Sequence, residues 1–244
     1  MKLGLLRPEH LVDVKTIPGL NAIVCDDDML AIGAAVTHAQ VEHSVEVRER
    51  VPILVEVESR VGNPRVRSAG TLAGNLCFAE PRSDVATVLL TLDARCIAGS
   101  RAGTRRFPVS ELLADAYSSS LAHDEVLTAI EVPVPEVGWA FGYRKFQFHV
   151  RPALAVALGL RLEGGEVVGS RLAVASAPEA PTRCPTAEAA LRGSLERVRA
   201  KSVEIAAAAA TDSALGDDDE FGGEYKAHLL GIALRDLLRG LAAA

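Results

Sequence analysis

The chain has 244 residues, of which 49% are hydrophobic, and it carries a formal net charge of −6 at pH 7. A chain of this length and composition can bury a sizeable core and has room for two domains. The acidic balance argues against a nucleic-acid partner, because such proteins need a concentrated basic face to neutralise phosphates.

Cysteine and histidine usage narrows the class of protein further. The four cysteines form no C-x-x-C pair, and no two of the six histidines are four residues apart. We therefore expect neither a metal site nor a disulfide framework. The sequence also has no signal pattern and no apolar run of membrane-spanning length, so we expect a cytoplasmic protein without a membrane span.

Short strands and helices alternate through the first half of the chain. Apolar runs predict five strands, at residues 11–14, 21–25, 29–34, 94–98 and 105–109. Thr37 with Gln40 three residues later forms a capping-box pattern that predicts a helix start. Pro52 predicts the first turn of a second helix, and a third is expected over residues 81–92.

Two prolines and a glycine interrupt the pattern near residues 133–138. They predict a boundary between a domain at residues 1–135 and a second domain at residues 138–244. The organisation as a whole is of the α+β class.

The second domain begins with two apolar runs, residues 153–162 and 166–176, that flank Gly164-Gly165 and predict an antiparallel hairpin. Three helices are expected after it, over residues 186–191, 195–211 and 224–241. The acidic stretch 216–223 between the last two predicts a solvated connector.

The densest cluster of small residues is Ser68–Asn75, and Asp84 follows it nine residues later. Glycine and alanine leave main chain uncovered, so a row of N–H groups there can face a phosphate or a flavin edge. We expect the run to form a loop after the helix that starts at Pro52. On composition alone, an ordinary tight turn between two strands explains the run more simply.

The wider context of this run carries a family resemblance. Residues 61–75, followed by Pro81 and Asp84, resemble the second flavin-binding segment of the molybdenum hydroxylase flavoproteins, the medium subunits of xanthine and carbon monoxide dehydrogenases. The resemblance continues over residues 89–94, 124–133 and 143–146. It implies a PCMH-type (vanillyl-alcohol-oxidase-like) FAD-binding domain, followed by a small domain of a sheet and helices.

The resemblance also implies a set of flavin contacts: Thr71, Leu72, Ala73, Gly74, Asn75, Asp84, Leu127 and Lys145. Residues 71–75 would hold pyrophosphate and ribityl oxygens, and Asp84 would accept hydrogen bonds from ribityl hydroxyls. Lys145 would lie near the pyrimidine edge of the flavin. Taken singly, Asp84 is equally interpreted as a surface cap and Lys145 as a solvated strand residue.

The arginines Arg60, Arg65 and Arg67 flank this segment. Two interpretations stay open for them: an exposed loop, or a contact with a partner subunit or a cofactor phosphate.

Three features depart from the family pattern. Residues 1–14 resemble the stretch that follows the family's N-terminal glycine-rich loop, so either the recorded chain starts at a downstream Met or this member is shortened. Ala73 replaces the usual glycine and requires a negative φ. At residues 148–153 the aromatic residue that stacks near the isoalloxazine is missing, and Pro152 withdraws a backbone donor.

The function implied by the resemblance is electron transfer. The chain would be the FAD-binding subunit of a molybdopterin-dependent dehydrogenase, with 2Fe-2S clusters on a small partner subunit and molybdopterin on a large one. Electrons would leave through FAD to NAD, a quinone or oxygen. The alternatives are a degenerate assembly subunit that has lost its flavin, which predicts a colourless protein, and a stand-alone FAD oxidoreductase, which predicts turnover without partners.

Overall fold

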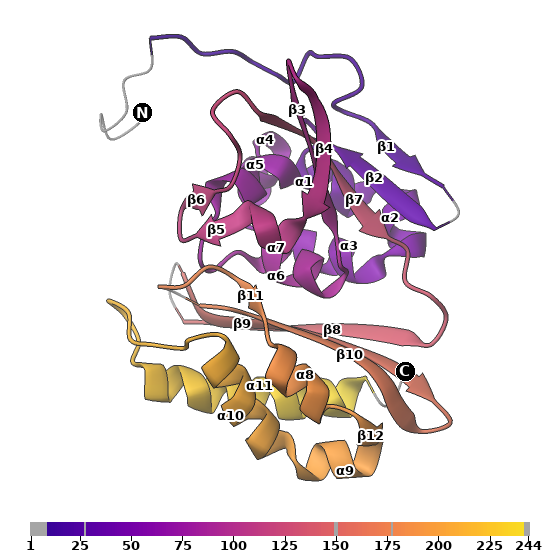
Figure 1. The fold of residues 1–244 in the computed structure, drawn as a ribbon, viewed down its shortest axis with the longest axis vertical. Helices are drawn as coiled ribbons and strands as arrows, with labels where there is room; N and C mark the ends of the chain where they lie inside the picture. The colour runs from indigo at the N-terminus through magenta and orange to yellow at the C-terminus, as the bar shows by residue number, and fades with distance from the viewer. Residues whose placement is uncertain (1–8, 27, 149–150, 177, 242–244) are drawn as a thin grey trace.

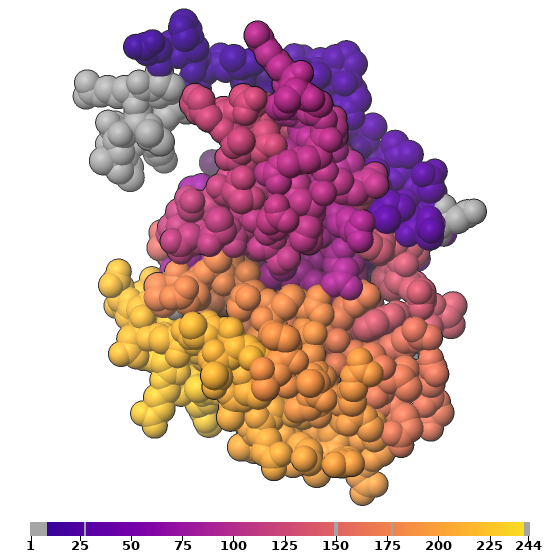
Figure 2. All heavy atoms as spheres, viewed as in Figure 1, coloured from indigo at the N-terminus to yellow at the C-terminus, as the bar shows by residue number. Residues whose placement is uncertain are grey.

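The computed structural model describes residues 9–26, 28–148, 151–176 and 178–241, and two antiparallel sheets organise them (Figure 1). The first sheet and its helices lie above the second sheet in this view, and the C-terminal helices lie below it. The space-filling view shows the two halves packed along a continuous seam (Figure 2). The mixture of sheets and helices confirms the predicted α+β class.

The first sheet has the strand order β1-β2-β7-β3-β4. Its strands are β1 (Ile23–Cys25), β2 (Met29–Gly33), β7 (Val126–Pro133), β3 (Arg95–Ser100) and β4 (Gly103–Pro108). A separate short pair is formed by β5 (Leu113–Asp115) and β6 (Ser118–Ser119). Strand β7 occupies the centre, and the chain passes from its end directly to the second sheet.

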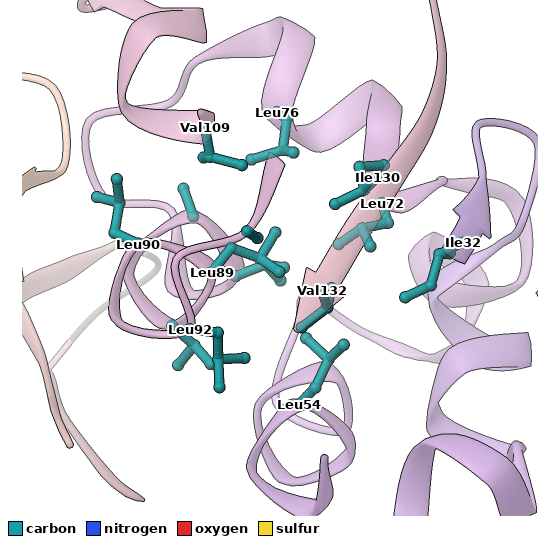
Figure 3. Close-up of a cluster of buried hydrophobic side chains, with 14 of the residues drawn as sticks. Ile32, Leu54, Leu72, Leu76, Leu89, Leu90, Leu92, Val109, Ile130 and Val132 are labelled. Atoms are coloured by element: carbon teal, nitrogen blue, oxygen red, sulfur yellow. The ribbon is translucent and has the colours of Figure 1, made fainter. Parts of the chain in front are cut away.

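Short helices accompany this sheet. They are α1 (His38–His43), α2 (Val45–Arg50), α3 (Pro52–Glu58), α4 (Pro64–Ala69), α5 (Leu72–Phe78), α6 (Asp84–Thr91) and α7 (Val109–Leu112). Local signals set several starts: Thr37 and Gln40 form the predicted capping box of α1, and Pro52 opens α3. Figure 3 shows Leu72 of α5, Leu89 of α6 and Ile130 of β7 among the buried side chains of the core.

The second sheet has the order β11-β10-β9-β8, with β12 paired to β10. Its strands are β8 (Trp139–Gln147), β9 (Pro152–Glu163), β10 (Glu166–Ala175), β11 (Thr182–Arg183) and β12 (Gly193–Ser194). The helices that follow are α8 (Pro185–Ala190), α9 (Leu195–Ala200), α10 (Ser202–Asp212) and α11 (Gly223–Gly240). Strands β9 and β10 are the predicted hairpin.

Strand β9 separates two hydrophobic cores. Ala155 and Ala157 belong to the core of the first half, whereas Leu154, Val156 and Leu158 belong to the core under the C-terminal helices. Because successive side chains of a strand point to opposite faces, a strand covered on both faces has a continuous apolar sequence. This explains the run from Ala153 to Leu160 without polar residues.

Several predicted elements are wrong. Residues 11–14 form no strand: Leu11 and Val12 are 73% and 82% exposed, and no strand pairs with them. The small-residue run is neither a loop nor a turn between strands. Its residues end α4 and begin α5, with Gly70 and Thr71 between the two helices, because Asn63 and Thr71 each cap a helix with their side chains.

Helix boundaries also shift. Helix α6 begins at Asp84 and not at residue 81, because the Ser83 hydroxyl accepts the N–H of Ala86 and caps it there. The helix predicted over 195–211 is divided into α9 and α10 at Lys201. The acidic stretch 216–223 is not simply solvated, since the Asp218 side chain is only 6% exposed between two basic side chains.

The described part of the chain contains no helix that is long and apolar enough to cross a membrane. Within the same ranges, no group of three or more His, Cys, Asp or Glu residues could hold a metal ion. All four cysteines are free thiols. Residues 1–8 and 149–150, which figure in two of the departures from the family pattern, lie outside the described residues.

Candidate functional site

The N-terminus of α5 is fixed from several sides. The Thr71 hydroxyl accepts the N–H of Gly74 at 3.0 Å, and Gly70 C=O accepts the N–H of His38 at 3.0 Å. The Leu72 N–H bonds to Val36 C=O at 3.4 Å. The segment is therefore held against α1 and the residues that precede it, Val36 and Thr37.

The backbone donors of this segment are mostly used within the protein. Of the four N–H groups from Leu72 to Asn75, three have acceptors: Val36 C=O, the Thr71 hydroxyl and Thr71 C=O. The side chains of Leu72 and Ala73 are buried in the first core. Most backbone N–H groups of this segment are therefore not available to a ligand, so ligand binding depends more on the side chains around the segment.

The two small residues of the segment fit their backbone. Ala73 is not among the described residues with positive φ, so the condition on its methyl group is met. A Cβ atom at Gly74 would lie 3.0 Å from the Thr71 Oγ1 atom, which is tighter than ordinary contact. Glycine at this position leaves room for the capping hydroxyl.

Removing this cap gives a first testable prediction. Thr71→Ala is expected to lower the free energy of unfolding by about 0.5–2 kcal/mol, because the Gly74 N–H loses its acceptor. Urea denaturation measures the change. Thr71→Ser keeps the hydroxyl and is the matched control, and equal stability of the two variants would contradict the role of the cap.

Three of the predicted site residues converge on one cavity of about 180 Å³ between the two halves. Asn75 comes from α5, Asp84 from the start of α6 and Lys145 from β8. The cavity is smaller than the roughly 300 Å³ of a pocket for a drug-sized ligand, so it accommodates only part of a large cofactor. Leu127 lies in the first core and does not line it.

A charged pair dominates one wall of this cavity. Lys145 Nζ donates to Asp84 Oδ2 at 2.6 Å, and the Tyr143 hydroxyl donates to Asp84 Oδ1 at 2.6 Å. The side chains of Asp84 and Lys145 are only 11% and 14% exposed. Burial, with help from the Asp84 carboxylate, raises the pKa of Tyr143 well above its ordinary value, so the phenol stays a donor.

Asn75 and Ser83 form a second polar pair. The Ser83 hydroxyl donates to Asn75 Oδ1 at 2.6 Å while it accepts the N–H of Ala86. This contact orients the Asn75 side chain, whose NH₂ group is a donor for a further acceptor. Tyr143 and Ser83 were not predicted as site residues. The signal for Ser83 was its position directly before Asp84 at a helix start.

The flanking arginines separate into different environments. Arg60 lines the cavity, pairs with Glu56 at 2.7 Å and lies over the Tyr143 ring at 6.0 Å. Arg67 pairs with Glu42 at 2.8 Å, away from the cavity lining. Arg65 is exposed and does not line the cavity either.

A comparison with protein-family models finds a match over the first part of the chain. The family model described as "FAD binding domain in molybdopterin dehydrogenase" matches residues 1–135, more than half of the chain. The chain belongs to this FAD-binding family. FAD is therefore its cofactor, and the resemblance predicted from residues 61–75 is confirmed.

Individual members of the family are similar over much of the chain. The alpha subunit of the 6-hydroxypseudooxynicotine dehydrogenase complex of Paenarthrobacter nicotinovorans is 33% identical over 185 residues, which cover 75% of this chain and 62% of that protein. This chain thus spans about three fifths of that relative. The carbon monoxide dehydrogenase medium chain of Afipia carboxidovorans is 28% identical over 237 residues, covering 96% of this chain and 82% of that one.

A solved structure extends the comparison to the fold. A chain of the cyanide-inactivated Cu,Mo-CO dehydrogenase superposes with a TM-score of 0.92 at 26% identity, covering 100% of this chain and 85% of that chain. The predicted fold, a PCMH-type FAD-binding domain with a C-terminal sheet and helices, is confirmed by this match.

The residues around the cavity fit part of a FAD molecule. Asp84 and Asn75 offer an acceptor and a donor for hydroxyl groups, and Arg60, Arg82 and Lys145 supply cationic donors. One of these donors, Arg82 Nε, is buried and has no hydrogen-bond partner among the described residues. A cavity with an unused buried donor suits a ligand that carries oxygen acceptors.

Proposed function

We propose that this chain is the FAD-carrying electron-transfer subunit of a molybdopterin-dependent dehydrogenase. It would act between 2Fe-2S clusters on a small partner subunit and an external electron acceptor, while a large subunit holds the molybdopterin. The observation that carries the proposal is the convergence of Asn75, Asp84 and Lys145 on one cavity in a chain of a FAD-binding family. When bound, FAD supplies the redox chemistry.

The contribution of the chain is to bind and orient the cofactor. In this proposal Asp84 accepts hydrogen bonds from ribityl hydroxyls, and Lys145 presents its ammonium group to the pyrimidine edge. The Tyr143 hydroxyl, 2.6 Å from Asp84, fixes the direction of the carboxylate. Thr71 and Gly74 shape the start of α5 beside Asn75, whereas Leu72, Ala73 and Leu127 contribute through packing, since all three are buried.

The proposed partners rest on what the relatives are. One relative is named as a subunit of a dehydrogenase complex and another as the medium chain of a dehydrogenase. By analogy we propose a large molybdopterin subunit and a small 2Fe-2S subunit for this chain as well. The free thiols of its four cysteines suit a reducing compartment, which supports the proposal of a cytoplasmic complex.

The absorbance spectrum of the purified chain tests this proposal. We expect flavin bands in the visible region, either as isolated or after FAD is added and the excess is removed. A chain that stays colourless after reconstitution would support the degenerate assembly subunit instead. Turnover of a substrate by the chain alone, without large or small subunits, would support the stand-alone oxidoreductase.

A further inference from the structure

The connector between α10 and α11 is tied to the cavity of about 180 Å³ by a buried ionic cluster. The Asp218 carboxylate lies 2.7 Å from Lys226 Nζ and 3.0 Å from Arg82 Nη2. Lys226, on α11, is fully buried, and Arg82 is 7% exposed. A contact across 136 residues therefore joins the C-terminal half to the loop that precedes α6.

Asp218 is held firmly in this position. Its Oδ1 atom accepts the N–H groups of Glu220 and Phe221 at 2.8 and 2.9 Å. Burial opposes ionisation, but the hydrogen bonds from Lys226 and from these two N–H groups prevail and lower the pKa of Asp218 to about 2. The carboxylate therefore stays charged at any physiological pH.

Arg82 has binding capacity that the protein does not use. Nη2 bonds to Asp218, and Nη1 is 4.0 Å from the Glu80 carboxylate. Nε is buried without a hydrogen-bond partner among the described residues, although Arg82 lines the cavity. A buried donor without an acceptor costs free energy, which an oxygen of a ligand in the cavity would recover.

The contacts of the Arg82 guanidinium leave donors for a ligand oxygen. Asp84 and Lys145 on the cavity wall neutralise each other at 2.6 Å. Asp218 is shared between two buried cations, Arg82 and Lys226, and Glu80 lies 4.0 Å from Arg82 Nη1, so Asp218 orients the guanidinium while Nη1 makes no close contact with a carboxylate. A guanidinium presents its N–H groups in a planar fork that matches phosphate oxygens.

We propose that Arg82 binds a phosphate oxygen of FAD, and that Asp218, held by Lys226, positions Arg82 for this contact. The inference rests on the proposed function, in which the cavity holds part of FAD. It adds a phosphate-binding side chain to the cavity that Asn75 also lines, next to residues 72–75, whose backbone N–H groups are mostly hydrogen-bonded within the protein.

Titration of the full chain with two flavins tests the role of Arg82. FAD carries a diphosphate and riboflavin carries none, and quenching of flavin fluorescence gives both dissociation constants. Arg82→Gln is expected to weaken FAD binding by about 10- to 100-fold, the loss of one hydrogen bond to a charged group, with riboflavin binding unchanged. Arg101→Gln, at an exposed turn, is the matched control.

A second pair of variants tests the positioning. Asp218→Asn is expected to weaken FAD binding in the same way, whereas Asp219→Asn, the exposed neighbour, is not. Thermal unfolding without FAD identifies any variant that fails to fold. If Arg82→Gln does not fold, Arg82→Lys replaces it in the titration. An intermediate loss of FAD affinity is expected for Arg82→Lys, because lysine keeps the positive charge but lacks the planar fork of the guanidinium.

Two results would overturn this inference and leave the proposed function standing. The first is unchanged FAD binding by folded Arg82→Gln. The second is an equal loss of affinity for FAD and for riboflavin, which would mean that Arg82 does not contact the phosphate. If the unmodified chain bound neither flavin, the proposed function itself would fail and this inference with it.

Discussion

Asp84→Ala is expected to weaken FAD binding by about 100-fold or more, the loss of one or two charge-assisted hydrogen bonds. In the proposed site the Asp84 carboxylate accepts from ribityl hydroxyls. It also accepts hydrogen bonds from Lys145 Nζ and the Tyr143 hydroxyl, each at 2.6 Å. Alanine therefore removes the contact with the ligand and also the hydrogen bonds that orient these two side chains. The dissociation constant of FAD, from fluorescence quenching, measures the effect.

Two controls separate binding from folding in this experiment. Asp84→Asn keeps one of the two oxygen acceptors that Tyr143 and Lys145 use and loses the charge, so we expect an intermediate affinity. Asp124→Asn changes an exposed carboxylate in the turn before β7 and should bind FAD normally. If Asp84→Ala binds FAD as tightly as the unmodified chain, the cavity is not the flavin site.

Local features of the structure were predictable from the sequence where a few neighbouring residues decide them. The capping box of Thr37 and Gln40 satisfies backbone donors in the first turn of α1, and Pro52, which has no N–H, opens α3 where a donor would lack an intrahelical acceptor. The β9–β10 hairpin follows from two apolar runs around Gly164-Gly165. Such signals need no knowledge of distant parts of the chain.

For residues 61–75 the predicted family resemblance is correct, but the predicted local structure is wrong. Its small residues suggested a loop, but Asn63 before Pro64 and Thr71 three residues before Gly74 are both helix-start signals. These caps are sufficient to predict α4 and α5. The Thr71 cap also engages the N–H of Gly74, within the run.

Contacts between distant residues were not accessible from the sequence. Asp84 and Lys145 are 61 residues apart, and Asp218 pairs with Arg82 from the other half of the chain. The connector around Asp218 looked solvated because its composition is acidic. Whether a carboxylate is exposed depends on which cations the fold brings to it, and composition does not record that.

A second large effect is expected at a buried pair behind the site. His38 Nδ1 lies 2.6 Å from Glu58 Oε2, with the two side chains 3% and 0% exposed. Glu58 Oε1 has no hydrogen-bond partner among the described residues. The backbone of His38 donates to Gly70 C=O, so the pair also supports the entry to α5.

His38→Ala is expected to lower the free energy of unfolding by about 2–4 kcal/mol, because it leaves the Glu58 carboxyl buried without a hydrogen-bond partner and a cavity in place of the imidazole. Urea denaturation near neutral pH measures the loss. His43→Ala, on the exposed end of the same helix, should change stability little. The double variant His38→Leu with Glu58→Leu should recover much of the loss, since a buried pair replaced by apolar side chains is often tolerated.

The pH dependence of stability gives this pair a distinct signature. Burial raises the pKa of Glu58 above its ordinary value of 4.5, although the hydrogen bond to His38 opposes the shift. The folded protein therefore keeps a proton that the unfolded chain releases. The associated stability is complete below pH 4.5 and is lost as the pH rises through the raised pKa.

Glu58→Gln removes this titration while keeping the size of the side chain. We therefore expect the stability of the unmodified protein, relative to the variant, to decrease as the pH rises from 4.5 towards neutrality. Urea denaturation of both proteins over this pH series measures the difference. A difference that grew with pH would mean that the buried carboxyl is stabilised in its charged form, and that contact with His38 outweighs the cost of burial.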